Sequence, residues 1–250
     1  MKILVCIPAR YNSTRLPGKP LLEINNKSII RLVYEAAKKI KYEKKIVILT
    51  DDNRIKDEVD SFSKNTCHII DEECLNGTDR IIRYLKKNDN DFDIIVNLQG
   101  DEPFIDLDNI HRAINNFVIK KKSNPELVCS TIHFSTFNTM DIMNNSRVKI
   151  VTDKYNNIMY ASRNSIPSGK HHKINLNIPY KIHIGLFVFD KDYLVNKFNQ
   201  ENTQYQLCED IEWLKIIEQG YKINTVEIKN HEIGVDTFGD YLFLKEKYEK

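Results

Sequence analysis

Hydrophobic and polar positions follow two alternating patterns along the first half of the chain. Short apolar runs of strand length occur at 2–8, 45–50, 66–70 and 93–98. The segments between them carry apolar residues at helical spacing and predict helices over 28–40, 53–62, 76–88 and 107–118. Strands that alternate with helices at this spacing indicate a parallel, doubly wound sheet.

The second half of the chain changes character. Strand-like runs at 127–134, 147–153, 157–161 and 180–189 follow one another with few helical segments between them. Such a run predicts antiparallel additions to the sheet or a small lobe that covers one side of a site. A polar, mobile surface loop is predicted at 164–179, a single helix over 205–219, a strand at 222–228 and a last helix from 238.

These patterns predict one α/β domain over residues 1–250 with a doubly wound, mostly parallel, Rossmann-like sheet. The stretch at about 130–190 is expected to contribute a small antiparallel lobe within that domain. No internal repeat or low-complexity tract divides the sequence.

Composition narrows the classes of function. Charged residues make up 29% of the chain but the net charge is only +2, which argues against a nucleic-acid partner. No apolar run is long enough for membrane insertion. The five cysteines are scattered, without a C-x-x-C pair, and no secretory signal is evident, so a cytoplasmic location is expected.

The first candidate site lies just after the opening apolar run. Arg10, Arg15 and Lys19 place three cations in a loop at the carboxyl end of the predicted strand, where α/β sheets bind ligands. Guanidinium and ammonium groups suit phosphate, although a solvated basic loop is the alternative. Neither a Walker loop nor a G-x-G-x-x-G pattern is present.

Acidic side chains provide a second candidate. Asp101 directly follows the strand at 93–98, where a carboxylate can hold Mg²⁺ against a nucleotide phosphate. An ordinary acidic turn explains it equally well. Asp236, in Gly234-Val235-Asp236-Thr237, could likewise hold a metal, but by itself this pattern favours a cap of the following helix.

Four segments together resemble one known family. They read IPARYNSTRLPGKPL at 7–21, NGTDR at 76–80, VNLQGDEP at 96–103 and GVDT at 234–237. The first is nearly letter for letter the opening of the 3-deoxy-manno-octulosonate (KDO) cytidylyltransferases. The resemblance implies a fold of the nucleotide-diphospho-sugar transferase type and a reaction that uses CTP and Mg²⁺.

The resemblance also implies roles for individual residues. Catalysis would involve Arg10, Arg15, Lys19 and Asp101, and the metal would lie on Asp101 and Asp236. The nucleotide would be bound by Pro8, Ala9, Arg10, Lys19, Asn76, Gly77, Arg80 and Gln99. Glu102 is expected to orient its loop, and the Asp51-Asp52 turn to have a structural role only.

For the acidic sugar, the resemblance implies contacts from Arg163, His183, Glu209 and Glu212. An arginine suits a sugar carboxylate, whereas a histidine on a strand is more often structural. The sequence departs from the family pattern at 186–189 and at 215–218, where Ile216 replaces an expected glutamine. These departures could change which acceptor sugar the pocket binds.

The sequence therefore predicts transfer of CMP from CTP to the anomeric hydroxyl of KDO or a related 3-deoxy-ulosonic acid. Pyrophosphate would leave, and the product would serve lipopolysaccharide or surface polysaccharide synthesis. The alternatives are another acidic acceptor, such as 8-amino-KDO or a sialic-type nonulosonic acid, and a nucleotide-binding regulatory module without catalysis. The resemblance implies a homodimer formed through the lobe.

Overall fold

The computed structural model describes residues 1–13, 15–88, 91–170, 173–198 and 201–249. Thr14 of the opening motif and the adjacent His171 and His172 of the predicted loop lie outside these residues. The chain packs as two compact units, Met1–His111 with Asn230–Lys250, and Arg112–Lys229. We call them unit 1 and unit 2. The single domain with a lobe at about 130–190 stays a prediction.

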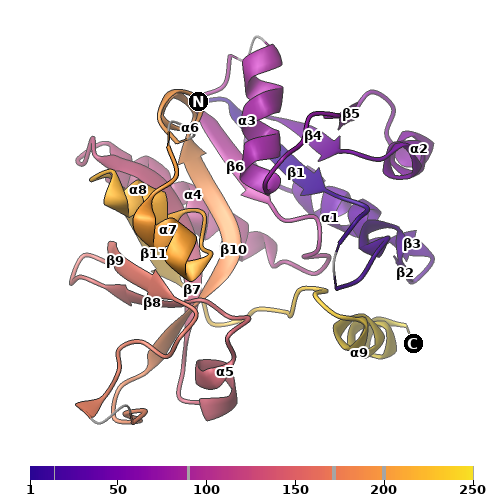
Figure 1. Ribbon diagram of the computed structural model, residues 1–250. Helices are drawn as coiled ribbons and strands as arrows, with labels where there is room; N and C mark the ends of the chain where they lie inside the picture. Colours follow the sequence, from indigo (N-terminus) through magenta and orange to yellow (C-terminus); the bar gives the residue numbers. More distant parts are fainter. Residues whose placement is uncertain (14, 89–90, 171–172, 199–200, 250) are drawn as a thin grey trace. The chain divides into compact units, whose positions relative to one another are not determined.

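Unit 1 holds the alternating elements of the first half of the chain (Figure 1). They are β1 (Ile3–Ala9), a 3₁₀ turn η1 (Lys19–Leu21), β2 (Glu23–Ile24), β3 (Lys27–Ser28), α1 (Ile29–Lys38), β4 (Lys44–Thr50), α2 (Asn53–Phe62), β5 (Cys67–Ile69), α3 (Gly77–Lys87), β6 (Ile94–Leu98) and the last helix α9 (Phe238–Tyr248). The helix α4 (Leu107–Lys121) crosses from unit 1 into unit 2.

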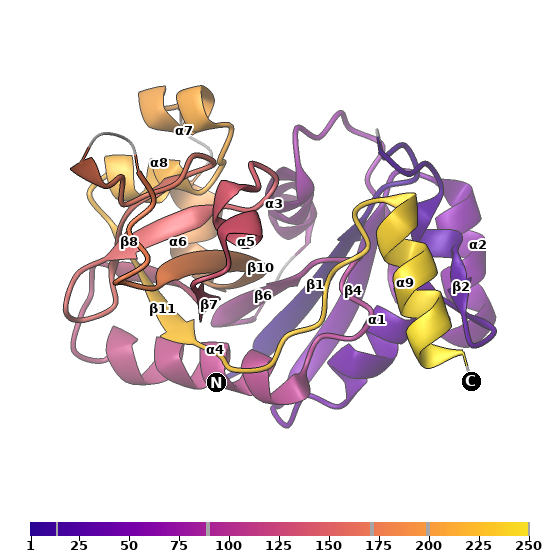
Figure 2. The ribbon, with the colours of Figure 1, turned by 90° about the horizontal axis from the view of Figure 1, so that it is seen from below.

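The sheet of unit 1 is parallel, with the strand order β6-β1-β4-β5. All residues of β1 and β6 are buried, which explains their continuous apolar runs. The helices α1 and α3 lie on opposite faces of β1 and β4 (Figure 2). The predicted parallel, doubly wound sheet of the first half is confirmed.

The end of the chain packs against its beginning within unit 1. The short hairpin of β2 and β3 turns at Asn25 and Asn26, both in the left-handed region with φ of 53° and 56°. Ile24 and Ile29 form a buried cluster with Val235, Tyr241 and Leu244. The cluster holds α9 beside β2, as Figure 2 shows.

Unit 2 holds the strand-rich second half. Its elements are β7 (Leu127–Thr136), α5 (Thr139–Met143), β8 (Lys149–Thr152), β9 (Ile158–Ser162), β10 (Tyr180–Asp190), α6 (Lys191–Asn196), α7 (Gln204–Glu209), α8 (Leu214–Glu218) and β11 (Lys222–Glu227). β10 pairs antiparallel with β7 and with β8, and β8 pairs antiparallel with β9. The predicted antiparallel additions are confirmed, with one parallel pairing of β11 along β7.

The helix predicted over 205–219 is wrong as a single element. The chain leaves the helical path at Asp210, whose φ of 52° is left-handed, and α8 begins only at Leu214. Arg163 accounts for the break, because its guanidinium donates to the carbonyls of Glu209 and Asp210, at 3.2 and 2.9 Å, and so satisfies groups at the end of α7. Ile211 is then buried in the core.

The short helices α5 and α6 were not predicted, because each spans fewer residues than an apolar period needs to show itself. Asn138 and Asp190 cap them through their side chains, which accept from Met140 N and Tyr193 N at 2.9 Å each. Among the described residues, no helix combines the length and apolar character that crossing a membrane requires.

Candidate functional site

A cavity opens in unit 1 at the carboxyl ends of β1 and β6, where a parallel sheet presents its ligand-binding loops. Its lining comes from separate stretches of the chain and comprises Pro8, Ala9, Arg10, Ser13, Arg15, Lys19, Pro20, Cys74, Leu75, Asn76, Gly77, Arg80, Gln99, Gly100, Asp101 and Asp236. Every residue predicted for catalysis, nucleotide binding or metal binding is in this set. The structure thus brings them together, while their individual roles remain predictions.

Lys19 occupies the centre of the charged groups. Gly18 turns the chain with a φ of 71°, in the left-handed region that favours glycine, and the η1 turn starts at Lys19. A Cβ at Gly18 would lie 3.3 Å from the Tyr11 ring, which packs over the turn. The Lys19 side chain is only 11% exposed, and its Nζ lies 2.7 Å from Asp101 Oδ2 and 3.8 Å from Asp236 Oδ1.

Arg15 adds a second cation to the same group. Its Nη2 lies 2.9 Å from Asp236 Oδ1, so Asp236 is close to both Arg15 and Lys19. The arrangement pairs the cations predicted to bind phosphate with the carboxylates predicted to bind a metal. A polyanion and a divalent cation entering together could therefore exchange these partners without leaving a charge unpaired.

Asp101 and Asp236 meet because the backbone joins their segments. Val235 N donates to Asp101 O at 2.9 Å. A Cβ at Gly234 would lie 2.9 Å from Glu102 Oε1, closer than real side chains allow. The segments of Gly234 and Glu102 are therefore in close contact, and the carboxylate of Asp236 lines the cavity.

Thr237, and not Asp236, is the N-cap of α9. Its hydroxyl accepts from Asp240 N at 3.2 Å, and Asp240 Oδ2 accepts from Thr237 N at 2.7 Å, which forms a capping box. The helix-cap interpretation of Asp236 is wrong for this reason. Asp236 contributes its backbone N–H to Asp240 at 3.1 Å and keeps its carboxylate in the cavity.

Glu102 stands next to this group of carboxylates. Burial raises the pKa of its carboxyl to about 8, and the negative charges of Asp101 and Asp236 act in the same direction, against Lys19. The backbone of Glu102 also joins the turn after β6, because its carbonyl accepts from Ile105 N at 3.3 Å. Its predicted part in orienting the loop agrees with this position and stays a prediction.

Three segments pack tightly beside the cavity. Asn76 caps α3, with its Oδ1 accepting from Asp79 N at 2.8 Å. A Cβ at Gly77 would lie 3.0 Å from Pro8 Cγ, and one at Gly100 would lie 2.7 Å from Pro8 O. The start of α3 and the loop after β6 can approach β1 only because both positions are glycine.

A buried amide and a buried hydroxyl support Gln99. Its Nε2 donates to Asn97 Oδ1 at 3.3 Å, and Asn97 Nδ2 donates to Thr78 Oγ1 at 3.3 Å. Asn97 and Thr78 are fully buried. Sequence reasoning missed both, although a polar asparagine inside the apolar run of β6 was a visible signal.

The donor set fits a hard divalent cation. Among the described residues, no group of three or more His, Cys, Asp and Glu side chains could hold a metal. Asp101 and Asp236 nevertheless lie within reach of the single ammonium of Lys19. Two carboxylates completed by phosphate oxygens and water are the set that Mg²⁺ favours, so the residues fit it.

In unit 2, Glu209 and Arg163 lie side by side. Glu209 accepts from Tyr160 Oη at 3.2 Å, from Ser162 Oγ at 2.8 Å and from Arg163 N at 3.1 Å. The Arg163 guanidinium binds the carbonyls at the end of α7, as described above. Both residues therefore hold β9 against α7, and their predicted sugar contacts stay predictions.

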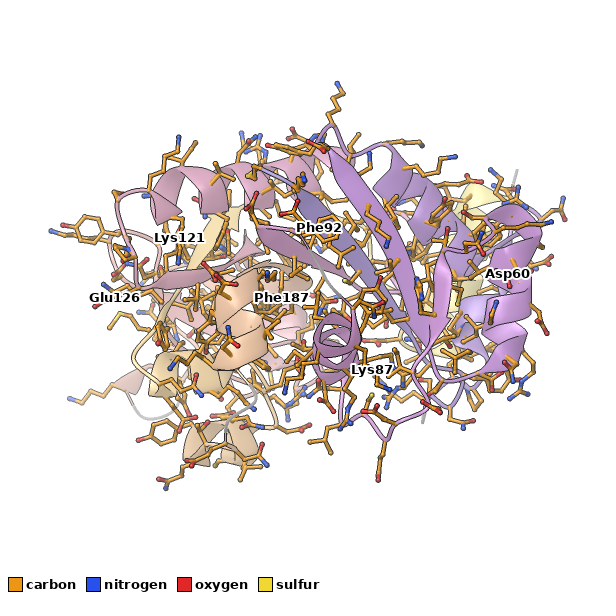
Figure 3. The ribbon with its side chains drawn as sticks, turned by 90° about the horizontal axis from the view of Figure 1, so that it is seen from above. Asp60, Lys87, Phe92, Lys121, Glu126 and Phe187 are labelled. Atoms are coloured by element: carbon orange, nitrogen blue, oxygen red, sulfur yellow. The ribbon has the colours of Figure 1, made fainter. Side chains whose placement is uncertain are left out.

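His183 and Glu212 are the other residues predicted for the sugar. His183 Nε2 lies 2.9 Å from Thr131 Oγ1, and its ring packs against Phe187 (labelled in Figure 3) and Trp213 at centroid distances of 5.1 and 4.9 Å. Burial lowers the pKa of His183 to about 3, so the ring is neutral at pH 7. This setting supports the structural interpretation. Glu212 is partly buried between α7 and α8.

The fold and the cavity define an α/β protein with a pocket lined by several cations at the carboxyl edge of a parallel sheet, the place where α/β sheets bind ligands. A family model described as cytidylyltransferase matches residues 4–229. The chain belongs to the cytidylyltransferase family.

Two relatives are similar to this chain along most of its length. The chain is 38% identical to 3-deoxy-manno-octulosonate cytidylyltransferase of Fusobacterium nucleatum, over 95% of this chain and 93% of the relative. It is 35% identical to the mitochondrial 3-deoxy-manno-octulosonate cytidylyltransferase of Arabidopsis thaliana, over 96% and 80%.

A solved structure carries the same fold. CMP:2-keto-3-deoxy-manno-octonic acid synthetase, complexed with CTP, superposes with a TM-score of 0.86 at 30% identity, over 99% of this chain and 98% of that chain. The predicted fold class, a Rossmann-like sheet of the nucleotide-sugar transferase type, is confirmed.

Proposed function

We propose that this chain transfers CMP from CTP to the anomeric hydroxyl of KDO and releases pyrophosphate. The convergence of Lys19 with Asp101 and Asp236 in one cavity carries the proposal. A relative of the same fold is complexed with CTP, and curated relatives are named for the KDO reaction. The fate of the product in lipopolysaccharide or surface polysaccharide synthesis belongs to the same proposal.

The reaction forms one P–O bond and breaks another. The sugar hydroxyl oxygen attacks the α-phosphorus, and the bond from that phosphorus to the oxygen that bridges it to the β-phosphate breaks. Arg10, Arg15 and Lys19 offset the negative charge of the triphosphate and of the leaving pyrophosphate. Positioning and charge stabilisation of this kind supply most of the rate in phosphoryl transfer.

Asp101 and Asp236 would hold Mg²⁺ beside the phosphates. When bound, the metal would supply positive charge to the phosphate oxygens and favour ionisation of the attacking hydroxyl. Its binding can be measured directly, through the paramagnetic signal of Mn²⁺ in the presence of CTP. We expect Asp101→Asn and Asp236→Asn to weaken this binding at least tenfold, and unchanged Mn²⁺ binding in both would refute the assignment.

The nucleoside half would rest on the remaining residues of the cavity. Asn76 and Gly77 present the start of α3, Arg80 adds a cation one turn further along, and Gln99 is fixed by Asn97. Together with Pro8 and Ala9 at the end of β1, we infer that these groups bind the cytidine part of CTP.

For the acceptor, we propose contacts from Arg163, Glu209 and Glu212 in unit 2, and for His183 the structural role that its burial supports. Most of the departures from the family pattern lie in the core, since Leu186, Val188 and Ile216 are fully buried, whereas Glu218 is partly exposed. The buried departures change packing rather than add groups to a surface. Whether the acceptor is instead another acidic sugar, such as 8-amino-KDO or a sialic-type acid, is tested by comparing acceptors in one assay.

The deciding experiment measures pyrophosphate release by the purified chain with CTP and Mg²⁺ fixed and the acceptor varied. We expect KDO to give the highest kcat/KM among KDO, 8-amino-KDO and a sialic-type acid. A higher value for another acid would reassign the acceptor. Tight CTP binding without pyrophosphate release for any acceptor would refute a catalytic role.

Two further properties complete the proposal. We infer a homodimer, supported by apolar side chains that unit 2 exposes around α5: Phe137 is 56%, Met140 78% and Met143 65% exposed. Light scattering after size-exclusion chromatography tests the mass.

We also place the reaction in the cytoplasm, because all five cysteines are free thiols.

A further inference from the structure

Asp51, at the carboxyl end of β4, forms an ion pair with a residue of the cavity. Its Oδ2 accepts from Arg80 Nη2 at 2.8 Å. The Arg80 side chain is only 7% exposed, whereas that of Asp51 is 36% exposed. The carboxylate therefore lies at the surface and the guanidinium lies beneath it, next to the cavity that Arg80 lines.

Arg80 keeps hydrogen-bonding capacity beyond this pair. Within the described residues, its buried Nη1 has no hydrogen-bond partner. An unpaired buried donor is costly, and a bound water, ion or ligand can complete it. Because Arg80 lines the cavity, an oxygen of a bound nucleotide is the group that fits this donor.

The second oxygen of Asp51 connects to the cationic loop. Oδ1 accepts from Tyr11 N at 3.4 Å, and Tyr11 O in turn accepts from Gly18 N at 2.9 Å, directly before Lys19. One carboxylate thus contacts both the arginine of α3 and the loop that carries the phosphate-binding cations. A side chain with only a local structural role in its own turn would not bridge these segments.

We propose that Asp51 is a positioning residue for the nucleotide, acting through Arg80. It holds Nη2 of the guanidinium by one hydrogen bond and leaves Nη1 to donate to an oxygen of the nucleotide. This inference rests on the proposed function, because it assumes that CTP occupies the cavity. It extends the structural role predicted for the Asp51-Asp52 turn, in which Asp52 caps α2 and pairs with Arg54.

The experiment is a double-mutant cycle on CTP affinity, measured by titration calorimetry of the full chain. We expect Asp51→Ala and Arg80→Ala each to weaken CTP binding at least tenfold. The double variant should bind CTP within twofold of Arg80→Ala, because Asp51 acts only through that arginine. Asp51→Glu, which keeps the charge, should recover at least half of the lost free energy of binding.

A purely structural role of Asp51 would affect CTP binding no more than the loss of another ion pair on α3. Glu72→Gln is the matched control, because Glu72 pairs with Arg83 on the same helix, at 2.6 Å, away from the cavity lining. It should leave the Kd for CTP within twofold of the wild type. Asp51→Asn, which preserves shape, serves if Asp51→Ala does not fold, and it should raise KM for CTP at least fivefold with KM for the acceptor unchanged.

The outcomes separate this inference from the proposed function. Wild-type CTP affinity in Asp51→Asn, or losses that multiply in the double variant, would overturn the positioning role and leave the reaction untouched. A wild-type chain that does not bind CTP would overturn both. Equal loss of affinity in Glu72→Gln would show a general effect of α3 ion pairs and would also overturn the inference.

Discussion

The ammonium of Lys19 lies 2.7 Å from a carboxylate oxygen of Asp101 and is almost buried. Asp236 approaches the same ammonium to 3.8 Å. One lysine therefore joins two carboxylates that would otherwise repel each other at short range. Loss of this lysine would leave the two carboxylates without their shared cation and remove the group that we propose binds phosphate.

Lys19→Ala should lower kcat for pyrophosphate release by about a hundred- to thousandfold, the usual cost of removing one group that stabilises transition-state charge. The fold should persist, because the buried strand β1 is untouched. Steady-state kinetics and far-ultraviolet circular dichroism measure the two effects. Lys27→Ala, which breaks a more exposed pair with Glu35, is the control and should retain full activity.

Gly100→Ala should destabilise the protein by about 1–3 kcal/mol, the typical cost of overpacking, because the added Cβ would meet Pro8 O at 2.7 Å. Gly239→Ala is its counterpart in the first turn of α9, where the nearest atom would lie 3.6 Å away. That change should stabilise by about 0.4–1 kcal/mol. Thermal or urea unfolding of both variants checks the prediction, and equal stability of the two would contradict it.

Glu209→Ala should destabilise unit 2 by about 1–3 kcal/mol, because it leaves Ser162 Oγ and Arg163 N without their shared acceptor. If Arg163 contacts the acceptor, KM for the sugar should rise while KM for CTP stays constant. Cys208→Ala, at the exposed neighbouring position, should change stability by less than about 0.5 kcal/mol. An unaltered unfolding midpoint in Glu209→Ala would contradict the bracing role.

The free energy of unfolding should decrease as the pH is lowered below 7, because His133 is buried in its neutral form. Burial lowers the pKa of His133 from 6.5 to about 4 in the folded protein. Between these values the unfolded chain binds a proton that the folded chain does not. The free energy of unfolding therefore decreases as pH falls, by about 1.4 kcal/mol per pH unit from this residue.

His133→Asn removes this titration and can preserve the contact that His133 Nδ1 makes with Thr225 Oγ1 at 2.8 Å. Urea unfolding at pH 7 and pH 5 should show a smaller loss of stability in the variant than in the wild type. Between pH 7.5 and 8 both proteins should behave alike, since His133 is neutral in both states there. Equal acid sensitivity of the two proteins would refute the assignment to His133.

The parallel half of the fold was predictable because its strands are buried on both faces. β1 and β6 leave continuous apolar runs in the sequence, and the charged or polar residues that follow them mark the ligand edge. The apolar runs place Lys19 and Asp101 at this edge, whereas the resemblance to the KDO cytidylyltransferases was needed to favour a metal site over an ordinary acidic turn at Asp101. The cap of α1 is likewise a contact between near neighbours in the sequence, because Ser28 accepts from Arg31 N at 3.3 Å.

What the sequence could not predict depends on distant partners. The break at Asp210 follows from Arg163, far away along the chain, so helical periodicity over 205–219 gave the wrong continuous helix. The cap at Thr237, by contrast, was visible in the local pattern Thr237-x-x-Asp240, a capping-box signature that the interpretation of Asp236 as the cap overlooked. Asp51 could not be paired with Arg80 from spacing alone, because the contact joins the ends of two different elements.

Unit 1 is built from two separate stretches of chain, with the whole of unit 2 inserted between them. The backbone bond from Val235 to Asp101 and the buried packing of α9 belong to the second stretch. During synthesis, the sheet of unit 1 can collapse early, yet its acidic pair stays incomplete until the ribosome has released the final residues. A chain that stops after unit 2 would therefore form the sheet of unit 1 but lack the second carboxylate of its cavity.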